Sequence, residues 1–319
     1  MTVTTAAETP MKPPRRRASS RPIWEEPPTP AGQIMKAVGL GLVVLAVAFP
    51  LYVVLVTSLS SQQAVDQAGG LVVVPHSLTP AAYLQIFSGG VVTRAVAVST
   101  FITVVGTALS LVVTTLAAYG LSRPGSLLHR PLLFVVLLTF LFGPGIVPSY
   151  LVVKSLGMID SYAALIIPTA INAFNLVVLR AFIMNIPGEL IDSARIDGAG
   201  EFAILRRIVL PLSKAVLAVV GLFYAVGYWN AFFNAMLYIN TTEKWPLQLV
   251  LRLYVVEGAA LPSGGGASGL ESSIAGMAPA PTVALKMAVI VIAAVPALVI
   301  YPFVQRHFTK GVIVGAIKG

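Results

Sequence analysis

The sequence contains no cysteine, and its three histidines, His76, His129 and His307, lie far apart along the chain. Disulfide bonds, thiol nucleophiles and thiolate metal ligands are therefore excluded. The histidines show none of the short spacings by which zinc ligands are usually paired. The sequence predicts neither a metal site nor a catalytic residue, and we expect no enzyme activity in this chain alone.

Charged residues are also scarce, at 10% of the 319 residues, whereas an ordinary soluble domain carries roughly a quarter. Hydrophobic residues make up 57% of the chain, and the mean hydropathy is +0.88. Apolar runs recur from Ile34 to Phe303 and leave no polar stretch long enough to form a separate soluble domain. The composition therefore predicts one integral membrane domain.

Six apolar stretches are long enough to cross a bilayer, because a hydrocarbon core about 30 Å thick requires about 20 residues of helix. The predicted fold class is all-α, a polytopic membrane protein with six transmembrane helices. These helices are expected over Ile34–Ser58, Ala95–Leu121, Pro131–Val153, Ser161–Ile183, Lys214–Ile239 and Ala284–Val304. The transmembrane domain then covers residues 34–306, with a disordered basic cytoplasmic tail over 1–33, an outer loop over 240–283 and a cytoplasmic carboxyl-terminal tail over 307–319.

The basic residues predict the orientation of the chain in the membrane. If the amino terminus is cytoplasmic, sixteen of the 21 basic residues fall in inner segments and five in outer segments. The positive-inside rule then places both termini in the cytoplasm of a multi-pass protein of the cell membrane. The same bias accounts for the net charge of +9 without a nucleic-acid partner.

Two absences bear on the energy source of a transporter. The sequence has no GxxxxGK[ST] phosphate loop, so ATP would have to be bound by another chain. No acidic residue lies deep in a predicted helix, since Asp160 and Glu189 lie at helix ends. Ion-coupled carriers usually place carboxylates near the middle of the membrane. An ion-coupled secondary carrier is thus disfavoured, and it remains an alternative together with a non-transporting membrane scaffold.

The inner loop between the fourth and fifth predicted helices carries the most informative pattern. Pro187 suits a helix start, and the acidic residues that follow it fall in the first turns, where the helix dipole favours them. Gly198 and Gly200 would end this helix, and a second helix is expected from Glu201 to Pro211. The pattern predicts a helix-turn-helix unit on the cytoplasmic surface.

This loop resembles the EAA loop of binding-protein-dependent ABC importer permeases, in which an acidic-Ala-Ala triplet is followed by Gly and later by I-x-L-P. Asp192-Ser193-Ala194, Gly198 and Ile208-Val209-Leu210-Pro211 stand at that spacing, with Asp for Glu and Ser for the first Ala. The resemblance implies that this coupling loop, residues 187–211, docks on a cytoplasmic ATPase. The docking residues that it implies are Glu189, Asp192, Ser193, Ala194, Asp197, Gly198, Ile208, Leu210 and Pro211.

The alternative for this loop is an amphipathic helix that lies on the lipid surface. Such helices are usually basic, whereas the first half of the loop carries Glu189, Asp192 and Asp197 against Arg195. Anionic lipid would repel this charge, which favours docking on a protein.

The resemblance covers the chain from about Ala95 to its end and is closest to the carbohydrate-uptake group, through Tyr228-Trp229-Asn230 and residues 308–319. It implies an ATP-driven importer of a carbohydrate, an oligosaccharide in the group that it resembles most, delivered by an external solute-binding protein. The implied partners are a second homologous permease subunit and two ATPase subunits that bind the ATP, so this chain needs no cofactor. The tail over 307–319 either reaches the ATPase dimer or packs as a helix through its glycines.

Polar side chains inside the predicted helices are costly unless they face a cavity or another helix. Asn172 with Asn175, and Asn230 with Asn234, are each expected to share a helix face. Amides match the hydroxyls of a sugar, and aromatic rings cover its apolar faces. The alternative is hydrogen bonding between helices of the two permease halves. The candidates for the translocation path are Asn172, Asn175, Tyr228, Trp229, Asn230 and Asn234, and the sequence does not identify the sugar.

Overall fold

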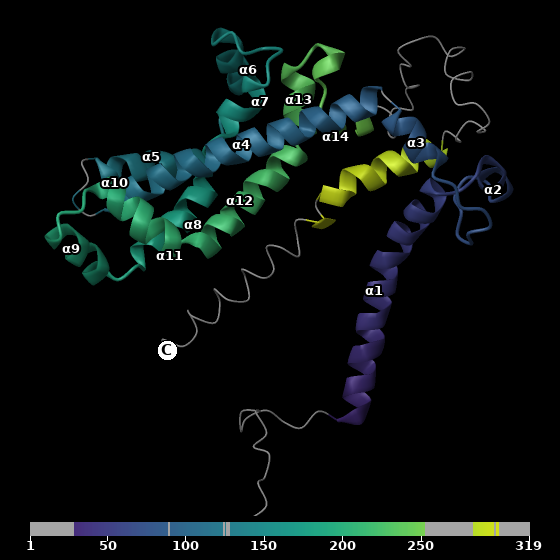
Figure 1. Cartoon of the computed structure of the whole chain (residues 1–319), viewed down its shortest axis with the longest axis horizontal. Coiled ribbons are helices and arrows are strands. Elements are labelled where there is room, and N and C mark those ends of the chain that lie inside the picture. The colour runs from purple at the N-terminus through teal and green to yellow at the C-terminus, as the bar shows by residue number, and fades with distance from the viewer. Residues whose placement is uncertain are drawn as a thin grey trace, which may run out of the picture. The chain divides into compact units, whose positions relative to one another are not determined.

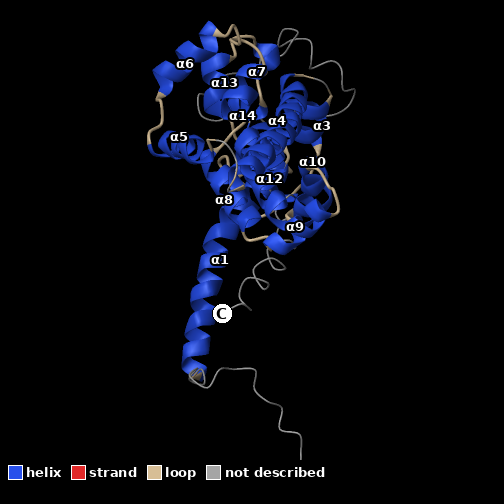
Figure 2. Cartoon of the chain, turned by 90° about the vertical axis from the view of Figure 1, so that its left-hand side faces the viewer, coloured by secondary structure: helices blue, strands red, loops and turns tan. Residues whose placement is uncertain are grey.

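The computed structural model describes residues 29–88, 90–123, 125, 128–252, 283–296 and 298–299. Within these residues every regular element is a helix (Figure 2). One isolated antiparallel bridge joins Ser60 and Leu78. The all-α class is therefore confirmed for this part of the chain. The predictions made for residues 1–28, 253–282 and 300–319 lie outside the described residues.

The chain divides into two compact units, Met1–Pro50 and Leu51–Gly319. The described part of the first unit is helical and belongs to α1 (Pro30–Ser58), which continues into the second unit. Both α1 and α4 (Val91–Ser122) are long and apolar enough to cross a membrane, and two bent helix pairs raise the number of such segments in the described residues to at most four.

α4 is the central helix of the second unit (Figure 1). It contacts α3 (Ala81–Phe87), α8 (Ala173–Met184), α12 (Lys214–Trp229) and α14 (Leu247–Leu251). Small and hydroxyl residues on α4, such as Gly106, Ser110 and Thr114, are buried against these neighbours. Close approach of small residues is a common means of packing helices in membranes, where burial of apolar surface gives no drive for association.

Two tyrosines of α12 fix it against α4. The hydroxyl of Tyr228 shares a hydrogen bond of 2.8 Å with Ser110 Oγ, and the hydroxyl of Tyr224 shares one of 2.6 Å with Thr114 Oγ1. The ring of Tyr228 lies against Gly106, where an added Cβ would stand only 2.8 Å from ring atoms. These contacts hold the two helices in one register.

Three of the expected membrane helices are broken, which corrects the prediction of continuous helices there. The third consists of α5 (His129–Leu141) and α6 (Ile146–Ser155), separated by residues 142–145. Gly145 has a left-handed φ of +80°, and Pro144 has no backbone N–H to donate, so the helix cannot continue through them.

The fourth expected helix is divided into α7 (Ala163–Ile166) with a short 3-10 turn over Ile167–Thr169, and then α8, at an angle of 47°. The fifth ends at Trp229 and resumes as α13 (Phe232–Tyr238). Between them Ala231, with φ −75° and ψ +65°, forms an inverse γ-turn closed by a 2.8 Å bond from the N–H of Phe232 to the carbonyl of Asn230. The described part of the sixth helix covers Val283–Pro296.

A carboxylate joins two loops near the ends of α6 and α13. Asp160 Oδ1 accepts from the backbone N–H groups of Asn240 (3.0 Å) and Thr241 (2.9 Å). Its Oδ2 accepts from the Thr241 hydroxyl (2.6 Å) and from Lys244 Nζ (2.8 Å). Lys244 belongs to a short 3-10 turn over Thr242–Lys244. These hydrogen bonds, with that of Lys244 first, hold the pKa of Asp160 well below its usual range.

Asp160→Asn is expected to lower the unfolding temperature of the purified protein by a few degrees at pH 7, because the amide cannot accept all of these bonds. A carboxylate with a depressed folded-state pKa stabilises the fold above its unfolded pKa of about 3.9, and this contribution is lost as the pH falls through the folded pKa. The difference between wild type and variant should therefore stay constant from about pH 7 to pH 5 and shrink below about pH 4. Glu243→Gln, an exposed neighbour, is the control. A difference unchanged in acid would contradict the assignment.

Candidate functional site

The coupling loop forms the helix-turn-helix unit that its sequence indicates. α9 (Gly188–Ile196) is followed by α10 (Glu201–Ile204), a short π-helix over Leu205–Val209 and α11 (Leu210–Leu212), all at the end of α4 that carries Ser122 (Figure 1). The second helix then meets α12 at 83°.

Gly198 closes α9 in a left-handed conformation, with φ +80°. The N–H of Gly198 donates to the carbonyl of Arg195 (3.0 Å), and the N–H of Ala199 donates to that of Ala194 (2.9 Å). This pair of bonds is the Schellman arrangement, which satisfies the free carbonyls at a helix end. The turn between α9 and α10 is therefore fixed by backbone geometry that glycine adopts without strain.

The loop divides into a buried side and an exposed side. Ile191, Ile204, Leu205 and Val209 are buried in the main apolar core. Of the predicted docking residues, Ala194, Ile208 and Leu210 are partly buried, whereas the exposed ones are Glu189, Asp192, Ser193, Asp197, Gly198 and Pro211.

Two large apolar side chains stand on either side of the glycine turn. Ile196 is 87% exposed and Phe202 is 72% exposed. The sequence interpretation did not single them out, although their position beside a polar turn is a signal that it could have used. Together with Asp192 and Asp197 they form a surface that combines exposed apolar area with negative charge. Exposed apolar residues framed by charge are typical of protein contact sites.

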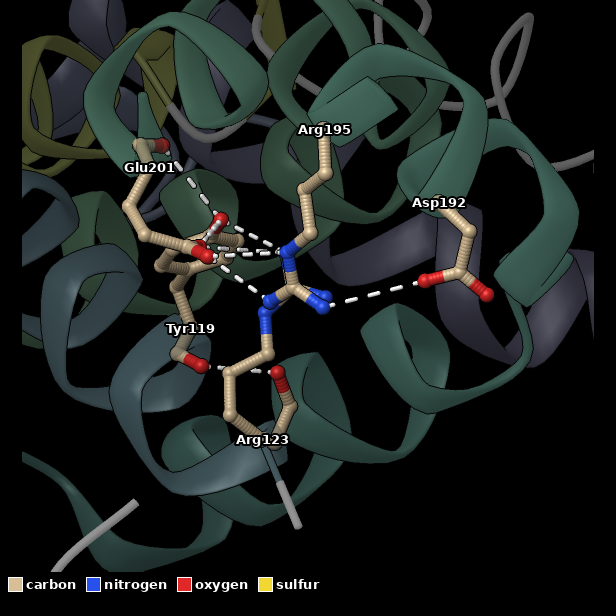
Figure 3. A network of polar contacts seen from close by, with 6 residues as sticks. Tyr119, Arg123, Asp192, Arg195 and Glu201 are labelled. Atoms are coloured by element: carbon tan, nitrogen blue, oxygen red, sulfur yellow. Dashed lines mark hydrogen bonds and ion pairs between the residues drawn. The ribbon is translucent and has the colours of Figure 1, made fainter. Parts of the chain in front are cut away.

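Glu201 ties this loop to the end of α4 (Figure 3). Its Oε1 accepts from Arg195 Nη2 (2.7 Å) and Nε (3.2 Å), across the glycine turn. Its Oε2 accepts from the hydroxyl of Tyr119 (2.5 Å), which in turn accepts from Arg123 Nη2 (2.6 Å). Arg123 also lies 4.4 Å above the Tyr119 ring and 3.7 Å from Glu201 Oε2. The bond from Tyr119, followed by that from Arg195, lowers the pKa of Glu201.

This network was not predicted. Glu201 was interpreted only as the start of a helix, and Tyr119 and Arg123 belong to another expected helix. The pairing depends on residues 82 positions apart in the chain, which spacing within one segment does not indicate.

A cavity of about 240 Å³ lies between α4, α12 and the helix Val283–Pro296. It is lined by Thr100, Thr103, Val104, Ala225, Val226, Trp229, Asn230 and Pro296. Thr103 Oγ1 is buried and has no hydrogen-bond partner among the described residues. A buried hydroxyl without a partner costs about 1–3 kcal/mol. The Thr103 hydroxyl in the lining is therefore available to a ligand, and the sequence analysis did not identify it.

The two aromatic candidates for the translocation path, Tyr228 and Trp229, pack against neighbouring helices. Tyr228 is buried, and its hydroxyl bonds to Ser110 and to the carbonyl of Ile166. Trp229 is 7% exposed, and its indole N–H donates to the carbonyl of Ala293 (2.9 Å). The Trp229 side chain also forms part of the wall of the cavity.

The amide candidates have different positions. Asn172 is exposed and caps α8, its Oδ1 accepting from the N–H of Asn175 (3.1 Å), while the Asn175 side chain is buried. Asn230 is exposed and caps α12, with Nδ2 donating to the carbonyl of Val226 (2.9 Å). Asn234 is partly buried in α13. The prediction that Asn230 and Asn234 share one helix face is wrong, because the γ-turn at Ala231 separates them.

Within the part of the chain that the structure describes, no three His, Asp or Glu side chains gather in a group that could hold a metal ion. In the coupling loop, Asp192 and Glu201 are instead paired with arginines.

Comparison with known proteins gives matches over most of the chain. Residues 106–314 match the family described as "Binding-protein-dependent transport system inner membrane component". The chain is 47% identical over 248 residues to the polygalacturonan/rhamnogalacturonan transport system permease protein YtcP of Bacillus subtilis, covering 78% of this chain and 85% of that protein. It is 46% identical over 245 residues to protein LplC of the same bacterium, covering 77% and 81%.

A solved structure is similar as well. It is the crystal structure of a bacterial ABC transporter involved in the import of the acidic polysaccharide alginate, with a TM-score of 0.78 and 30% identity to one chain. The match covers 86% of this chain and 96% of that one.

Proposed function

The chain belongs to the family of binding-protein-dependent transport system inner membrane components, and from that premise we propose that it carries an oligosaccharide across the membrane as one of two permease subunits of an ABC importer. It is a permease and not the ATPase. The hydrolysis of ATP takes place in separate subunits, and an external solute-binding protein delivers the substrate. The observation that supports this proposal most strongly is the 47% identity to a polygalacturonan/rhamnogalacturonan permease over 78% of the chain.

The arrangement in the membrane that we propose has six crossings, both termini in the cytoplasm and the coupling loop on the cytoplasmic side. The distribution of basic residues supports it. The broken helices count as single crossings in this scheme, as helices interrupted within a membrane protein do where protein or water covers the break.

The docking surface for the ATPase is the exposed side of the coupling loop. This side carries acidic residues, among them Asp192 and Asp197, and acidic residues do not bind lipid headgroups as a basic helix does. They would pair with basic groups of the ATPase. Ile196 and Phe202 add apolar contact area, and the fixed turn at Gly198 keeps the surface rigid. Closure of the ATPase dimer would move this surface and change access to the path between the permeases.

The substrate class that we propose is an oligosaccharide that contains uronic acid. Two of the similar proteins are named for acidic polysaccharides, polygalacturonan/rhamnogalacturonan and alginate. The cavity beside Asn230 is the candidate contact on this chain. Thr100, Thr103 and Asn230 offer hydroxyl and amide groups to sugar hydroxyls, and the Trp229 wall is apolar. Its volume of about 240 Å³ suits a single sugar unit of a longer chain.

The test is uptake into vesicles that contain the complete transporter, with ATP inside and the solute-binding protein outside. We expect ATP-dependent uptake of labelled trigalacturonate and little uptake of maltotriose. Asn230→Ala should lower uptake about ten-fold, because a lost hydrogen bond with its partner left unsatisfied costs about 1–3 kcal/mol. Asn185→Ala is the matched control, since Asn185 caps α8 with the same side-chain bond, to the carbonyl of Ala181 (3.1 Å).

Three results would contradict parts of this proposal. Uptake driven by an ion gradient without ATP would show an ion-coupled carrier. Unchanged uptake by a transporter that lacks this chain would show a scaffold. Preference for maltotriose would reject the acidic substrate class while leaving the importer in place.

A further inference from the structure

We infer that Glu201 is a positioning residue that transmits movement of the coupling loop to α4 through Tyr119 and Arg123. The inference rests on the proposed function, because it names how this chain connects its ATPase-facing loop to the helix that lines the cavity. The connection is the hydrogen-bonded series Arg195, Glu201, Tyr119 and Arg123 (Figure 3).

The chain itself connects the coupling loop only to α8 and α12, which precede and follow it. α4 ends at Ser122, 65 residues before the loop begins at Pro187, so any tie between them is a contact across the fold. Glu201 provides such a tie with two separate oxygens. Oε1 faces Arg195 on α9, and Oε2 faces Tyr119 on α4. One carboxylate thereby holds both helices of the loop against α4.

Arg195 connects this tie to the exposed surface. Its guanidinium lies 2.7 Å from Glu201 Oε1 and 3.7 Å from Asp192 Oδ1. Asp192 is among the residues that we propose to face the ATPase. A basic group of the ATPase that approaches Asp192 would compete with Arg195 for its carboxylate, and Arg195 would then pair with Glu201 alone. Binding of the ATPase at Asp192 would thereby change the pairing of Arg195 and, through it, the position of Glu201.

α4 carries the effect onward to the cavity. Its hydroxyls Ser110 and Thr114 bond to Tyr228 and Tyr224 of α12, and its residues Thr100 and Thr103 line the cavity. A shift of α4 at Tyr119 therefore reaches both walls of the cavity through direct contacts. Packed helices with hydrogen bonds between them transmit displacements as units.

The loop keeps other attachments when Glu201 is altered. Ile204, Leu205 and Val209 stay buried in the core, and the end of α4 is also held by α8, where Arg180 Nε donates to the carbonyl of Leu121 (2.9 Å). We therefore expect Glu201→Gln and Tyr119→Phe to assemble with the ATPase. What changes is the efficiency with which hydrolysis drives uptake.

The experiment measures the number of ATP molecules hydrolysed per oligosaccharide imported, with the complete transporter in vesicles and trigalacturonate as substrate. Glu201→Gln and Tyr119→Phe should each raise this ratio about ten-fold, because a hydrogen bond to a charged group commonly shifts an equilibrium by that factor or more. Glu243→Gln and Tyr162→Phe are the controls. Glu243 is exposed, and Tyr162 lies just before α7, where its ring packs against that of Phe101. Both controls should keep the wild-type ratio.

A charge exchange separates two roles of Glu201. In Arg195→Glu with Glu201→Arg, the pair across the glycine turn is restored, but residue 201 now repels Arg123 and cannot accept from Tyr119. Arg195→Gln, which loses the ion pair with Asp192 but leaves Tyr119 bonded to Glu201, controls for the change at position 195. We expect this double variant to stay uncoupled. Restored coupling would overturn the inference, because Glu201 would then act only within the loop.

Two further outcomes also overturn it. If wild type imports with ATP and both single variants keep its ratio, the inference fails and the proposed function stands. If both variants lose the ATPase during purification, Glu201 and Tyr119 are structural residues of the loop. Absence of ATP-driven uptake by wild type would instead reject the proposed function, and the inference with it.

Discussion

Gly198→Val is expected to abolish productive coupling to the ATPase while leaving the chain folded in the membrane. Gly198 has φ +80°, and a β-branched residue in that conformation is strongly disfavoured. A strained residue of this kind costs about 1–3 kcal/mol. Relief of the strain would break the Schellman bonds and reorient α9 relative to α10. We expect uptake to fall at least about ten-fold, with loss of ATPase from the purified complex.

Gly200→Ala is the matched control for this variant. Gly200 lies two residues further on in the same exposed turn, has φ −71°, and has open space where a Cβ would stand. Alanine should be accepted there, with near wild-type uptake and ATPase binding. If Gly198→Val also retains both, the turn geometry is not required for docking, and the proposed role of the loop is contradicted.

Trp229→Ala is expected to destabilise the protein by about 3–5 kcal/mol, the usual cost of removing a buried aromatic side chain. The Trp229 ring packs in a second apolar cluster with residues of α3, α4, α14 and the helix Val283–Pro296. Its indole N–H also satisfies the carbonyl of Ala293. The measurement is the unfolding temperature in detergent, together with the yield of protein that elutes as a single species.

Asn230→Ala is the control for stability, since Asn230 is the next residue and is exposed. Its unfolding temperature should fall much less than that of Trp229→Ala, since only the exposed side-chain bond to the carbonyl of Val226 is lost, even though its uptake falls. A Trp229→Ala protein that is as stable as wild type but inactive in uptake would show that Trp229 contacts the substrate, and not only the neighbouring helices.

The coupling loop is the part of the structure that its sequence predicts most closely. Local signals are sufficient there: a proline at the helix start, acidic residues in the first turns and a glycine at the end. Each of these acts on its own backbone neighbours, so its effect depends little on the rest of the fold. The α4 helix is predicted for a similar reason, because an apolar run of its length has few alternatives.

The breaks in the other helices were not predicted, because hydropathy does not report backbone geometry. Residues 142–145 are Phe-Gly-Pro-Gly and residue 168 is proline, which are signals for a break that the length criterion for membrane helices does not use. The roles of polar residues were unpredictable for a different reason. Whether Tyr228 faces a cavity or Ser110 depends on which helices become neighbours, and that is a property of the tertiary fold.

The interruption between α5 and α6 has a consequence for how the protein is made. α5 has 13 residues and is about 20 Å long, too short for a 30 Å hydrocarbon layer. Residues 142–145 are exposed in this chain, and of their peptide groups the N–H of Phe142 and the carbonyl of Gly145 have partners on Leu138 and Ser149. Lipid offers no hydrogen bonds to the other peptide groups. A copy synthesised without its companion permease would expose these peptide groups to lipid hydrocarbon, which cannot form hydrogen bonds with them. We therefore expect the chain to be less stable in the membrane when it is synthesised alone than with its companion permease, as its half-life after synthesis is stopped would show.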